Sequence, residues 1–432
     1  MSQQSLSQQP LPRPNVYRQP GFIAFVIARL IAVFAMQIQA IVVAWQVYEI
    51  TGDPLSLAYV GLAQFIPMLL LLMPAGDLID RYDRKRVLAL SWTGAALCSG
   101  ALLWLSMHEA EDAHWFYAAL VLYGCARAFI GPALTSLLPQ IVPRDHLAQA
   151  IATNSMIMRT ATILGPVLGG VLYALNGGVL TYSVCLACFA GGLLLLTRVP
   201  VLYADQRPDT QETTGWQRFT AGIHFIRSRP IVLGTISLDL FAVLLGGVVA
   251  LLPIYASDVL HVGADGLGLL RSAMAIGEIL VGVYLSARPF NNHVGITMFI
   301  AVAIFGVANI VFALSSLFWL SFAALLVAGA ADMVSMYIRS ALIQFSTPDS
   351  MRGRVNAVNM LFISSSNELG VFRAGISAAW VGAVPAALIG GFCTLGVVGG
   401  WAAAFKSLRQ VSRFEDASPE RFSAAGAEPN LK

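Results

Sequence analysis

The feature that most constrains the fold is a short, strongly charged stretch, residues 76–86, which carries seven charged side chains within eleven residues. It separates two apolar runs, residues 55–75 and 87–107. Each run is about as long as the roughly 20 helical residues that cross a bilayer core of about 30 Å. The pattern predicts a tight turn between two membrane helices. Four of its charges are basic, which indicates a cytoplasmic turn, because cytoplasmic loops are enriched in Lys and Arg.

The composition of the whole chain also indicates a polytopic membrane protein. Of the 432 residues, 57% are hydrophobic and only 11% are charged, whereas soluble domains are about 25% charged. We predict an all-α membrane protein with twelve transmembrane helices in two sets of six. Their approximate ranges are 21–48, 55–76, 87–107, 114–138, 148–174, 178–198, 230–257, 266–287, 294–314, 317–343, 355–381 and 383–405.

Lys and Arg are distributed asymmetrically along the chain. Twenty of the 26 lie in the two tails, the central gap (counting Arg198 at its edge) and the loops after the second, fourth, eighth and tenth segments, and six lie inside segments. None lies in the other loops, which predicts that both termini are cytoplasmic. The expected domains are a cytoplasmic tail (1–20), an N-terminal six-helix bundle (21–198), a cytoplasmic linker with an interfacial helix (199–229), a C-terminal six-helix bundle (230–405) and a disordered cytoplasmic tail (406–432).

The two sets of helices are expected to be duplicated. Residues 135–155 can be aligned without a gap on residues 339–359, with Leu, Gln and Asp at equivalent positions. Both stretches are expected to join the end of a fourth helix to the start of a fifth. Internal repeats are typical of secondary transporters, so we predict two pseudo-symmetric bundles.

Several short motifs resemble the major facilitator superfamily. They are Gly76-x-x-x-Asp80-Arg81-x-x-Arg84-Lys85 in the charged turn, Arg127-x-x-x-Gly131 in the fourth helix, and the antiporter-associated Gly165-Pro166-x-x-Gly169-Gly170 in the fifth. Stretches in both halves, at residues 45–52, 80–84, 352–355 and 366–370, together resemble its enterobactin-exporter-like branch. The resemblance covers most of the chain and implies the major facilitator fold.

The resemblance implies a gate at the charged turn. Asp80 would face the cytoplasmic start of the eleventh helix near Val355, whose free N–H groups attract a carboxylate. The contact would keep the cytoplasmic side closed in the outward-open state. The alternative is that the basic residues only fix topology. The expected gate residues are Gly76, Asp80, Arg81, Arg84 and Lys85.

The antiporter-type motif gives the fifth helix a smooth face of small residues, which allows a neighbouring helix to approach closely. The residues concerned are Gly165, Pro166, Gly169 and Gly170. Two interpretations are open, plain helix packing and a role in sealing the interface between the halves of an exporter.

Charged residues inside the predicted helices are candidate functional positions, because a charge at the bilayer centre costs about 2.5–3.5 kcal/mol on insertion scales. The first half has only arginines there, namely Arg29, Arg127 and Arg159. The second half has acids and further arginines: Asp239, Glu278, Asp332, Glu368, Arg271, Arg339 and Arg373. The resemblance places helices 1, 4, 7 and 10 around a central cavity. The candidate substrate-binding residues are therefore Arg29, Gln37, Arg127, Asp239 and Asp332.

Each intramembrane position has a structural alternative. The acids Asp239, Glu278, Asp332 and Glu368 are candidate proton-coupling sites, or they form structural ion pairs across helices. Arg127 requires an acceptor, which can be a carboxylate of the second half, a backbone carbonyl or the substrate. Gln37 either binds a polar ligand or hydrogen-bonds a neighbouring helix.

Other functional classes lack their sequence signatures. The chain has no Gly-x-x-x-x-Gly-Lys loop for ATP, and its six His lie in or beside loops, so no cofactor and no metal site are expected. The predicted helices contain no cluster of His, Ser or acidic residues at one membrane depth, which a membrane enzyme would need. The expected partners are a small-molecule substrate, protons and the lipid bilayer, without nucleic acid, and the chain is expected to act as a monomer.

The resemblance and the charges together predict a secondary active exporter in a bacterial inner membrane. It would move a small organic molecule outward in exchange for protons. Because the first half offers only positive charge, we expect a siderophore or a similar polar anionic metabolite. The alternatives are a multidrug or macrolide efflux pump of the same branch, a polytopic membrane enzyme and a non-transporting receptor.

Overall fold

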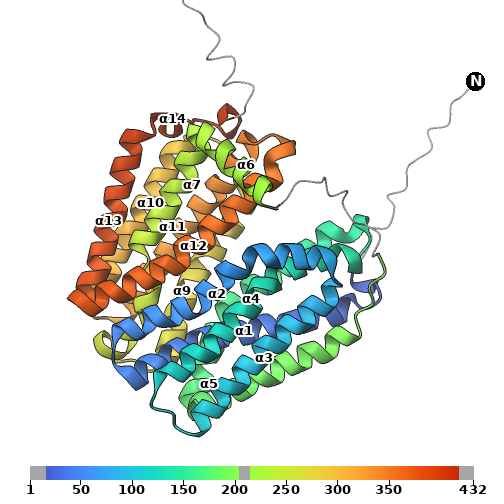
Figure 1. Cartoon of the computed structure of the whole chain (residues 1–432). Helices are drawn as coiled ribbons and strands as arrows, with labels where there is room; N and C mark the ends of the chain where they lie inside the picture. Colours follow the sequence, from blue (N-terminus) through green and yellow to red (C-terminus); the bar gives the residue numbers. More distant parts are fainter. Residues whose placement is uncertain (1–15, 204–214, 418–432) are drawn as a thin grey trace, which may run out of the picture.

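The computed structural model describes residues 16–203 and 215–417, except for a few side chains inside these ranges, those of Met73, Asp80, Arg144, residues 215–219, Asp349 and Ser350. The secondary structure of the described residues is entirely helical. Figure 1 shows two helical bundles that meet at one end and splay apart toward the end where helix α6 lies, so that the molecule has the outline of a V.

The first bundle consists of five long helices, one of which is broken. They are α1 (Phe22–Thr51), α2 (Pro54–Arg81), α3 (Arg84–Met107), α4 (Ala113–Ile141) and α5 (Leu147–Thr197). Helix α5 has 51 residues and would be about 76 Å long if straight, far longer than a bilayer core. Asn176 and Gly177 leave helical geometry, with φ at Gly177 of 57°, and divide α5 where the sequence predicts the end of the fifth helix.

The second bundle begins with the linker helix α6 (Gly215–Ser228). It continues with α7 (Pro230–Gly246), α8 (Leu252–Ile254), α9 (Ala264–Ala287), α10 (Val294–Leu314), α11 (Phe318–Ser346), α12 (Asp349–Val381), α13 (Ala383–Ala404) and α14 (Lys406–Arg409). The segment expected over residues 230–257 corresponds to one candidate span, Pro230–Val259, but it is not a continuous α-helix, because α7 ends at Gly246. The Gly246-Gly247 pair, which is unfavourable inside a helix, lies at that end.

Ten helices of the described chain are long and apolar enough to cross a membrane. Helix α5 counts once among them although it is broken, and α12 is not among them although it has 33 residues. The predicted count of twelve therefore requires both the division of α5 and the inclusion of α12. Residues 352–355 lie inside α12 rather than in a loop, which corrects the sequence-based boundary.

Side-chain caps fix the tight turns at the starts of three helices. The Asp53 carboxylate accepts the Leu55 N–H at 2.9 Å before α2, and the Asp83 carboxylate accepts the Lys85 N–H at 2.9 Å before α3. Asp112 caps α4 in the same way through His114 N–H. Asp is among the best N-cap residues, so the sequence places these helix starts locally.

The C-terminal segment after Lys406 packs against the second bundle up to its last described residue, which corrects the expectation of disorder for residues 406–417. Leu408 and Phe414 are buried in a cluster with α7, α10 and α11. The carbonyls of Val411 and Ser412 accept the N–H groups of Gly295 and Val294 at 3.0 and 3.2 Å. The segment thus satisfies two of the free N–H groups at the start of α10.

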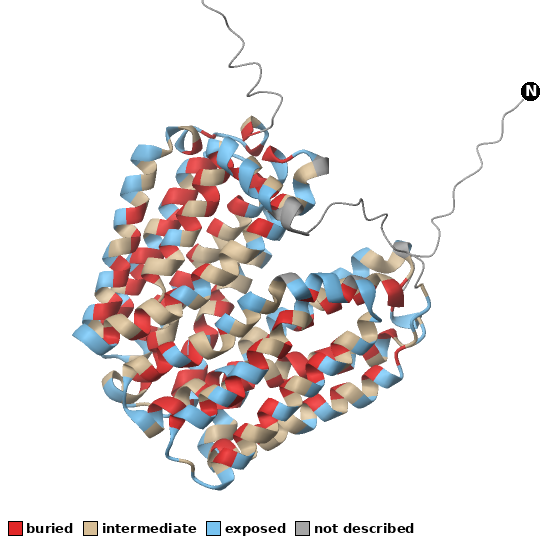
Figure 2. Cartoon of the chain, in the orientation of Figure 1, coloured by how far each residue is buried: buried red, intermediate tan, exposed pale blue. Residues whose placement is uncertain are grey.

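Large apolar side chains are exposed on the outer faces of both bundles. Figure 2 shows the exposed residues of these faces in pale blue. Leu70 is 70% exposed, Leu90 74% and Trp380 83%. In water such a surface would be costly, whereas in a bilayer it contacts lipid. The belt of exposed apolar residues is therefore the membrane-facing surface.

The two bundles contact one another mainly through two helix pairs, α5 with α9 and α2 with α12. Small residues permit both contacts. A Cβ on Gly170 would lie 2.2 Å from the Ala264 carbonyl oxygen, and a Cβ on Gly268 would lie 2.4 Å from the Pro166 oxygen. At the other contact, a Cβ on Gly375 would lie 2.8 Å from the Ala58 Cβ.

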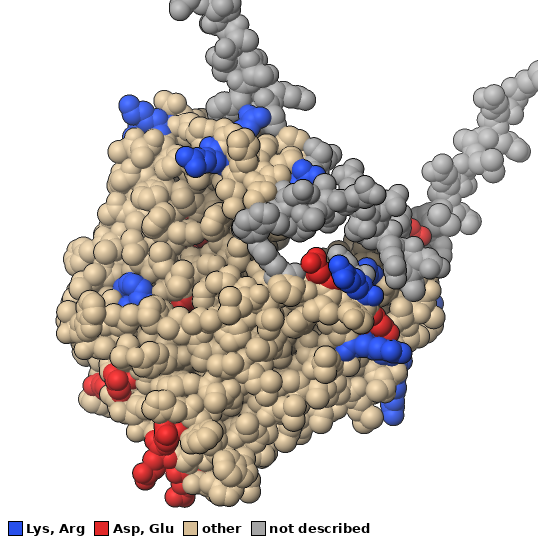
Figure 3. Space-filling view, viewed as in Figure 1, with Lys and Arg blue, Asp and Glu red and all other residues tan. Residues whose placement is uncertain are grey.

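Surface charge is segregated between the two ends of the molecule, and Figure 3 shows basic side chains near α6 and α14 and acidic side chains at the opposite end. The opposite end has the loops around Asp53, Asp112 and Asp258, which contain no Lys or Arg. Both α6 and the charged stretch at residues 76–86, which contains Lys85, have more basic than acidic side chains. The segregation agrees with the asymmetry on which the predicted topology rests.

Candidate functional site

Two ion pairs join the bundles through side chains of their interior faces. In the first, Arg127 of α4 donates from Nη1 to Oε1 of Glu368 in α12 at 2.9 Å. The two side chains are 36% and 15% exposed, so the pair is partly shielded from solvent. Among the three acceptors open to Arg127, this structure provides a carboxylate of the second bundle in a charge-assisted hydrogen bond.

The second pair is looser. Arg159 Nη1 of α5 lies 3.9 Å from Glu278 Oε2 of α9, beyond hydrogen-bonding distance. Arg271 lies two turns before Glu278 on the same face of α9, and it interacts electrostatically with both Glu278 and Glu368. A series of alternating charges therefore crosses the space between the bundles.

A cavity of about 440 Å³ lies beside the Arg159–Glu278 pair. Side chains of four helices, α1, α5, α9 and α11, line it: Arg29, Asn154, Ser155, Met158, Arg159, Thr162, Ala275, Glu278, Ile279 and Met336. Arg29 is only 6% exposed, and its Nε and Nη1 atoms have no hydrogen-bond partner. The cavity thus combines two guanidinium groups, one carboxylate and several neutral polar groups.

Asp239 has a structural partner in this conformation. It pairs with Arg339 of α11, and both side chains are at most 8% exposed. Both residues belong to the second bundle, so the pair does not join the halves. Of the two interpretations of Asp239, the geometry favours the ion pair, because removing either partner would leave a buried charge uncompensated.

Asp332 differs from the other three acids. No described residue forms a hydrogen bond or ion pair with its carboxylate, although Glu278 is close enough to interact with it electrostatically. Asp332 is half-buried on α11, next to α9. It is the acid of the four that can gain or lose a proton without breaking an ion pair.

The glutamines of α1 contact neighbouring helices. Gln37 donates from Nε2 to Thr162 Oγ1 of α5 at 3.0 Å. Gln46 donates to Ser106 Oγ at 3.0 Å and accepts from Tyr182 OH at 2.9 Å. These contacts favour the packing interpretation of Gln37 over ligand binding.

The antiporter-type motif faces two helices at once. A Cβ on Gly165 would lie 2.5 Å from Gln37 Cβ, and one on Gly169 would lie 2.9 Å from Ile41, both on α1. Gly170 and Pro166 face α9 of the other bundle, and Ser272 Oγ of α9 donates to the Ile163 carbonyl at 2.5 Å. The motif lies both within its own bundle and at the interface between the halves.

The charged turn is anchored within its own bundle. Lys85 Nζ donates to the carbonyls of Thr197 and Val199 at 3.2 and 2.6 Å, where a cation stabilises the end of α5. Arg81 is exposed, Arg84 is half-buried, and a Cβ on Gly76 would point into open space rather than against another helix. The Asp80 side chain, on which the expected gate depends, lies outside the described side chains.

Sequence reasoning missed a contact between the bundles at the end opposite α6. Tyr48 OH of α1 donates to Asp258 Oδ2 at 2.5 Å. No local pattern marks a tyrosine for such a long-range contact. Arg159 is among the intramembrane charges predicted from the sequence but not among the substrate-binding candidates, because the resemblance places helices 1, 4, 7 and 10, and not the fifth, around the cavity.

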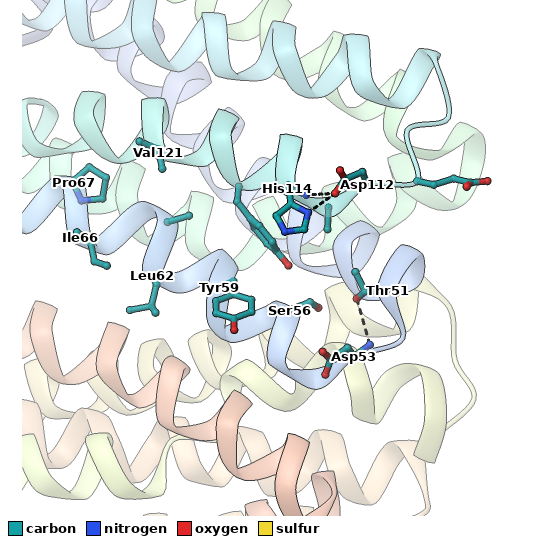
Figure 4. Close-up of a pocket in the computed structure, with 14 residues that line it drawn as sticks. Thr51, Asp53, Ser56, Tyr59, Leu62, Ile66, Pro67, Asp112, His114 and Val121 are labelled. Carbon is teal, nitrogen blue, oxygen red and sulfur yellow. Dashed lines mark hydrogen bonds and ion pairs between the residues drawn. The ribbon is translucent and has the colours of Figure 1, made fainter.

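A second hollow, of about 870 Å³, lies between α2 and α4 (Figure 4). Tyr59, Leu62, Ile66, Pro67 and Val121 give it mainly apolar walls. At its outer end, the Asp112 carboxylate accepts hydrogen bonds from His114, which lower the pKa of Asp112. The hollow can accommodate an apolar molecule or a lipid chain, and its ionisable lining residues are Asp53, Glu111, Asp112 and His114.

Two helical bundles with small-residue contacts and charged groups between them define a membrane transporter of the major facilitator fold. The chain belongs to the transmembrane secretion effector family, whose sequence profile matches residues 14–431. This confirms the resemblance drawn from the motifs. It also excludes the enzyme alternative, because the relatives and the proteins of the same fold described below are transporters.

The chain is 26% identical over 380 residues to the enterobactin exporter EntS of Citrobacter koseri, covering 86% of this chain and 89% of that protein. It is 26% identical to EntS of Escherichia coli O1:K1 over 346 residues, covering 78% and 80%.

Solved transporters have the same fold. A bacterial homologue of the lysosomal transporter Spinster, inward-facing and unoccupied, has a TM-score of 0.68 at 15% identity, covering 93% of this chain and 97% of that chain. An inward-facing bacterial homologue of ferroportin has a TM-score of 0.67 at 17% identity, covering 92% and 100%.

Proposed function

We propose that this protein is a proton-coupled secondary exporter of a small organic anion, a siderophore or a similar polar metabolite, and that it acts as a monomer in a bacterial inner membrane. The observation that carries the proposal is the set of charged groups between the halves. Arg29, Arg127 and Arg159 are supplied by a half in which the only acid within a candidate span of the described residues, Glu49, lies in the last turn of α1. The name of the related enterobactin exporters supports the same class of substrate.

Asp332 is the acid that we propose for proton coupling. Glu368 and Asp239 are held in ion pairs, and Glu278 lies opposite Arg159. A transported proton must bind and leave in each cycle, which an acid without a fixed counter-ion can do at the smallest cost in broken contacts. The ion-paired acids would instead hold helices together.

We further propose that the basic end of the molecule faces the cytoplasm. The separation of the bundles at that end then makes this conformation inward-facing, like the solved homologues of Spinster and ferroportin. The proposed gate between Asp80 and the start of α12 would form only after the bundles approach one another at this end.

Uptake into inside-out membrane vesicles tests the exporter proposal. Vesicles that contain the wild-type chain should accumulate enterobactin when an inward-acidic pH gradient is imposed, and dissipation of the gradient should abolish the accumulation. Asp332→Asn should reduce gradient-driven accumulation by about tenfold or more while leaving the amount of protein in the membrane unchanged. Accumulation that ignores the gradient would refute proton coupling, and failure to transport any anionic siderophore would refute the substrate class.

The apolar hollow between α2 and α4 supports a second candidate, export of an apolar drug such as a macrolide. Tyr59 and Tyr117 pack edge to face there, with ring centroids 5.8 Å apart, and offer an aromatic surface. Macrolide resistance of cells that express the chain tests this candidate. If it is correct, Tyr59→Ala should lower resistance. Wild-type vesicles should then accumulate no enterobactin, so Asp332→Asn would have no effect in the enterobactin assay.

A further inference from the structure

The cavity beside α5 and α9 contains an arginine without a counter-charge. Arg29 is 94% buried, on the basis of its 6% exposed fraction, and it lines the cavity. Its Nε and Nη1 atoms have no partner, and no ion pair of the described residues includes it. A guanidinium keeps its charge when buried, so it requires an acceptor that the described chain does not supply.

The neighbouring charges leave the cavity with an excess of positive charge. Arg159 and Glu278 also line it, and their 3.9 Å separation is too long for a hydrogen bond. Two positive groups thus face one negative group. Arg159 is 46% exposed at its side chain and can turn away from Glu278 toward a ligand.

The neutral groups of the cavity suit an oxygen-bearing anion. Asn154 lines the same wall of α5 as Arg159, and its side-chain amide can donate hydrogen bonds, whereas the Thr162 hydroxyl already donates to the Met158 carbonyl at 2.8 Å. Guanidinium groups bind planar pairs of oxygen atoms in a bidentate manner, and 440 Å³ is ample for an aryl carboxylate. Arg127, in contrast, already donates to Glu368 at 2.9 Å and is less available to a ligand.

We propose that Arg29 and Arg159 form an anion-binding site in this cavity and that Glu278 competes with the ligand for Arg159. The ligand is an oxyanion that a guanidinium can bind through two oxygens, either a carboxylate-like acidic group of the transported molecule or the phosphate of a lipid headgroup. If the ligand is the acidic group of the transported molecule, the proposal rests on the proposed function. It assigns the cargo's acid to α1 and α5 rather than to Arg127.

Charge-selective labelling of a cavity residue tests the site without transport. Ser155 lines the cavity and is exposed, so Ser155→Cys can be introduced into the full chain after its five native cysteines have been replaced. The label is an anionic methanethiosulfonate (the sulfonatoethyl reagent) or a cationic one (the trimethylammonium reagent). Their rate ratio reports the potential inside the cavity.

The proposal predicts opposite effects for the three charged residues. Arg29→Gln and Arg159→Gln should each lower the anionic-to-cationic rate ratio by roughly fivefold, and Glu278→Gln should raise it by a similar factor. Arg86→Gln, which removes a highly exposed arginine at the turn, is the matched control and should leave the ratio unchanged. A ratio that Arg29→Gln and Glu278→Gln do not move in these directions would overturn the site.

Protection of Ser155→Cys from labelling identifies the source of the anion. Salicylate should slow labelling whereas its uncharged analogue salicylamide should not, and Arg29→Gln should abolish the protection. The assay is run in phosphatidylcholine nanodiscs with and without phosphatidylglycerol. Salicylate protection that phosphatidylglycerol does not reduce assigns the site to cargo. If phosphatidylglycerol itself protects the cysteine and displaces salicylate, the site binds lipid. Absence of protection by either overturns the site. Because no readout requires export, a failed enterobactin assay with intact charge selectivity would refute only the proposed function.

Discussion

The Arg127–Glu368 pair gives the sharpest prediction for individual residues. Removing either partner leaves a charge that is only partly exposed, so Arg127→Gln and Glu368→Gln should each lower stability by about 1–3 kcal/mol, less than the ~3–5 kcal/mol of a fully buried pair. The double variant should recover most of the loss, because neither charge remains. Thermal unfolding of the purified protein measures this recovery. If the double variant is as unstable as the sum of the single losses, the pair does not stabilise the fold.

Single residues also show where sequence reasoning ends. The need of Arg127 for an acceptor follows from its charge and its apolar surroundings, and the sequence limited the choice to three kinds. It could not select Glu368, because the two residues are 241 positions apart and meet only through the packing of two bundles. The pairing of Asp239 with Arg339 could not be distinguished from a proton site either, because it forms only through the packing of α7 against α11 within the second bundle.

At the level of helices, the close contact of α5 with α9 makes a second prediction. A Cβ on Gly170 would lie 2.2 Å from the Ala264 carbonyl, so Gly170→Leu should force the two helices apart and slow export about tenfold or more. Gly131→Ala is the control, since nothing lies within 4 Å of its added Cβ. Vesicle transport measures both variants. Normal transport by Gly170→Leu would show that this contact is not needed in the cycle.

The helices themselves were largely predictable from local physics. Apolar length located the membrane segments, and the Asn176-Gly177 break lies where turn residues separate two runs. The errors have physical causes as well. Helix α12 extends to Asp349 through a polar stretch that hydropathy cannot recognise, and Phe414 packs against the second bundle through contacts distant in sequence.

For the whole molecule, the proposed gate predicts a shift between two conformations. Asp80→Asn should weaken the closed cytoplasmic side by about 0.3–2 kcal/mol, the usual worth of a charge at a helix end, and should impair transport without loss of protein. Crosslinking of cysteines placed in the α2–α3 turn and at the start of α12 reports the fraction of closed molecules. Asp83→Asn is a control that removes a neighbouring charge. Equal crosslinking and transport in wild type and Asp80→Asn would exclude the gate.

The fold formed by the two bundles was predictable from the sequence, but the conformation in which they are seen was not. Motifs and repeated hydropathy gave the major facilitator fold, which the structure and the family assignment confirm. The opening at one end could not be predicted, because both conformations bury the same sequence pattern and differ only in which contacts between the bundles are formed.

Proton movement driven by the substrate tests the central claim of exchange most directly. Proteoliposomes loaded with enterobactin and a pH-sensitive dye are diluted into substrate-free buffer with no initial pH gradient. The exchange account predicts that the lumen becomes acidic as substrate leaves, and that Asp332→Asn abolishes the acidification. Substrate efflux with a lumen that keeps its pH or becomes alkaline would contradict proton exchange.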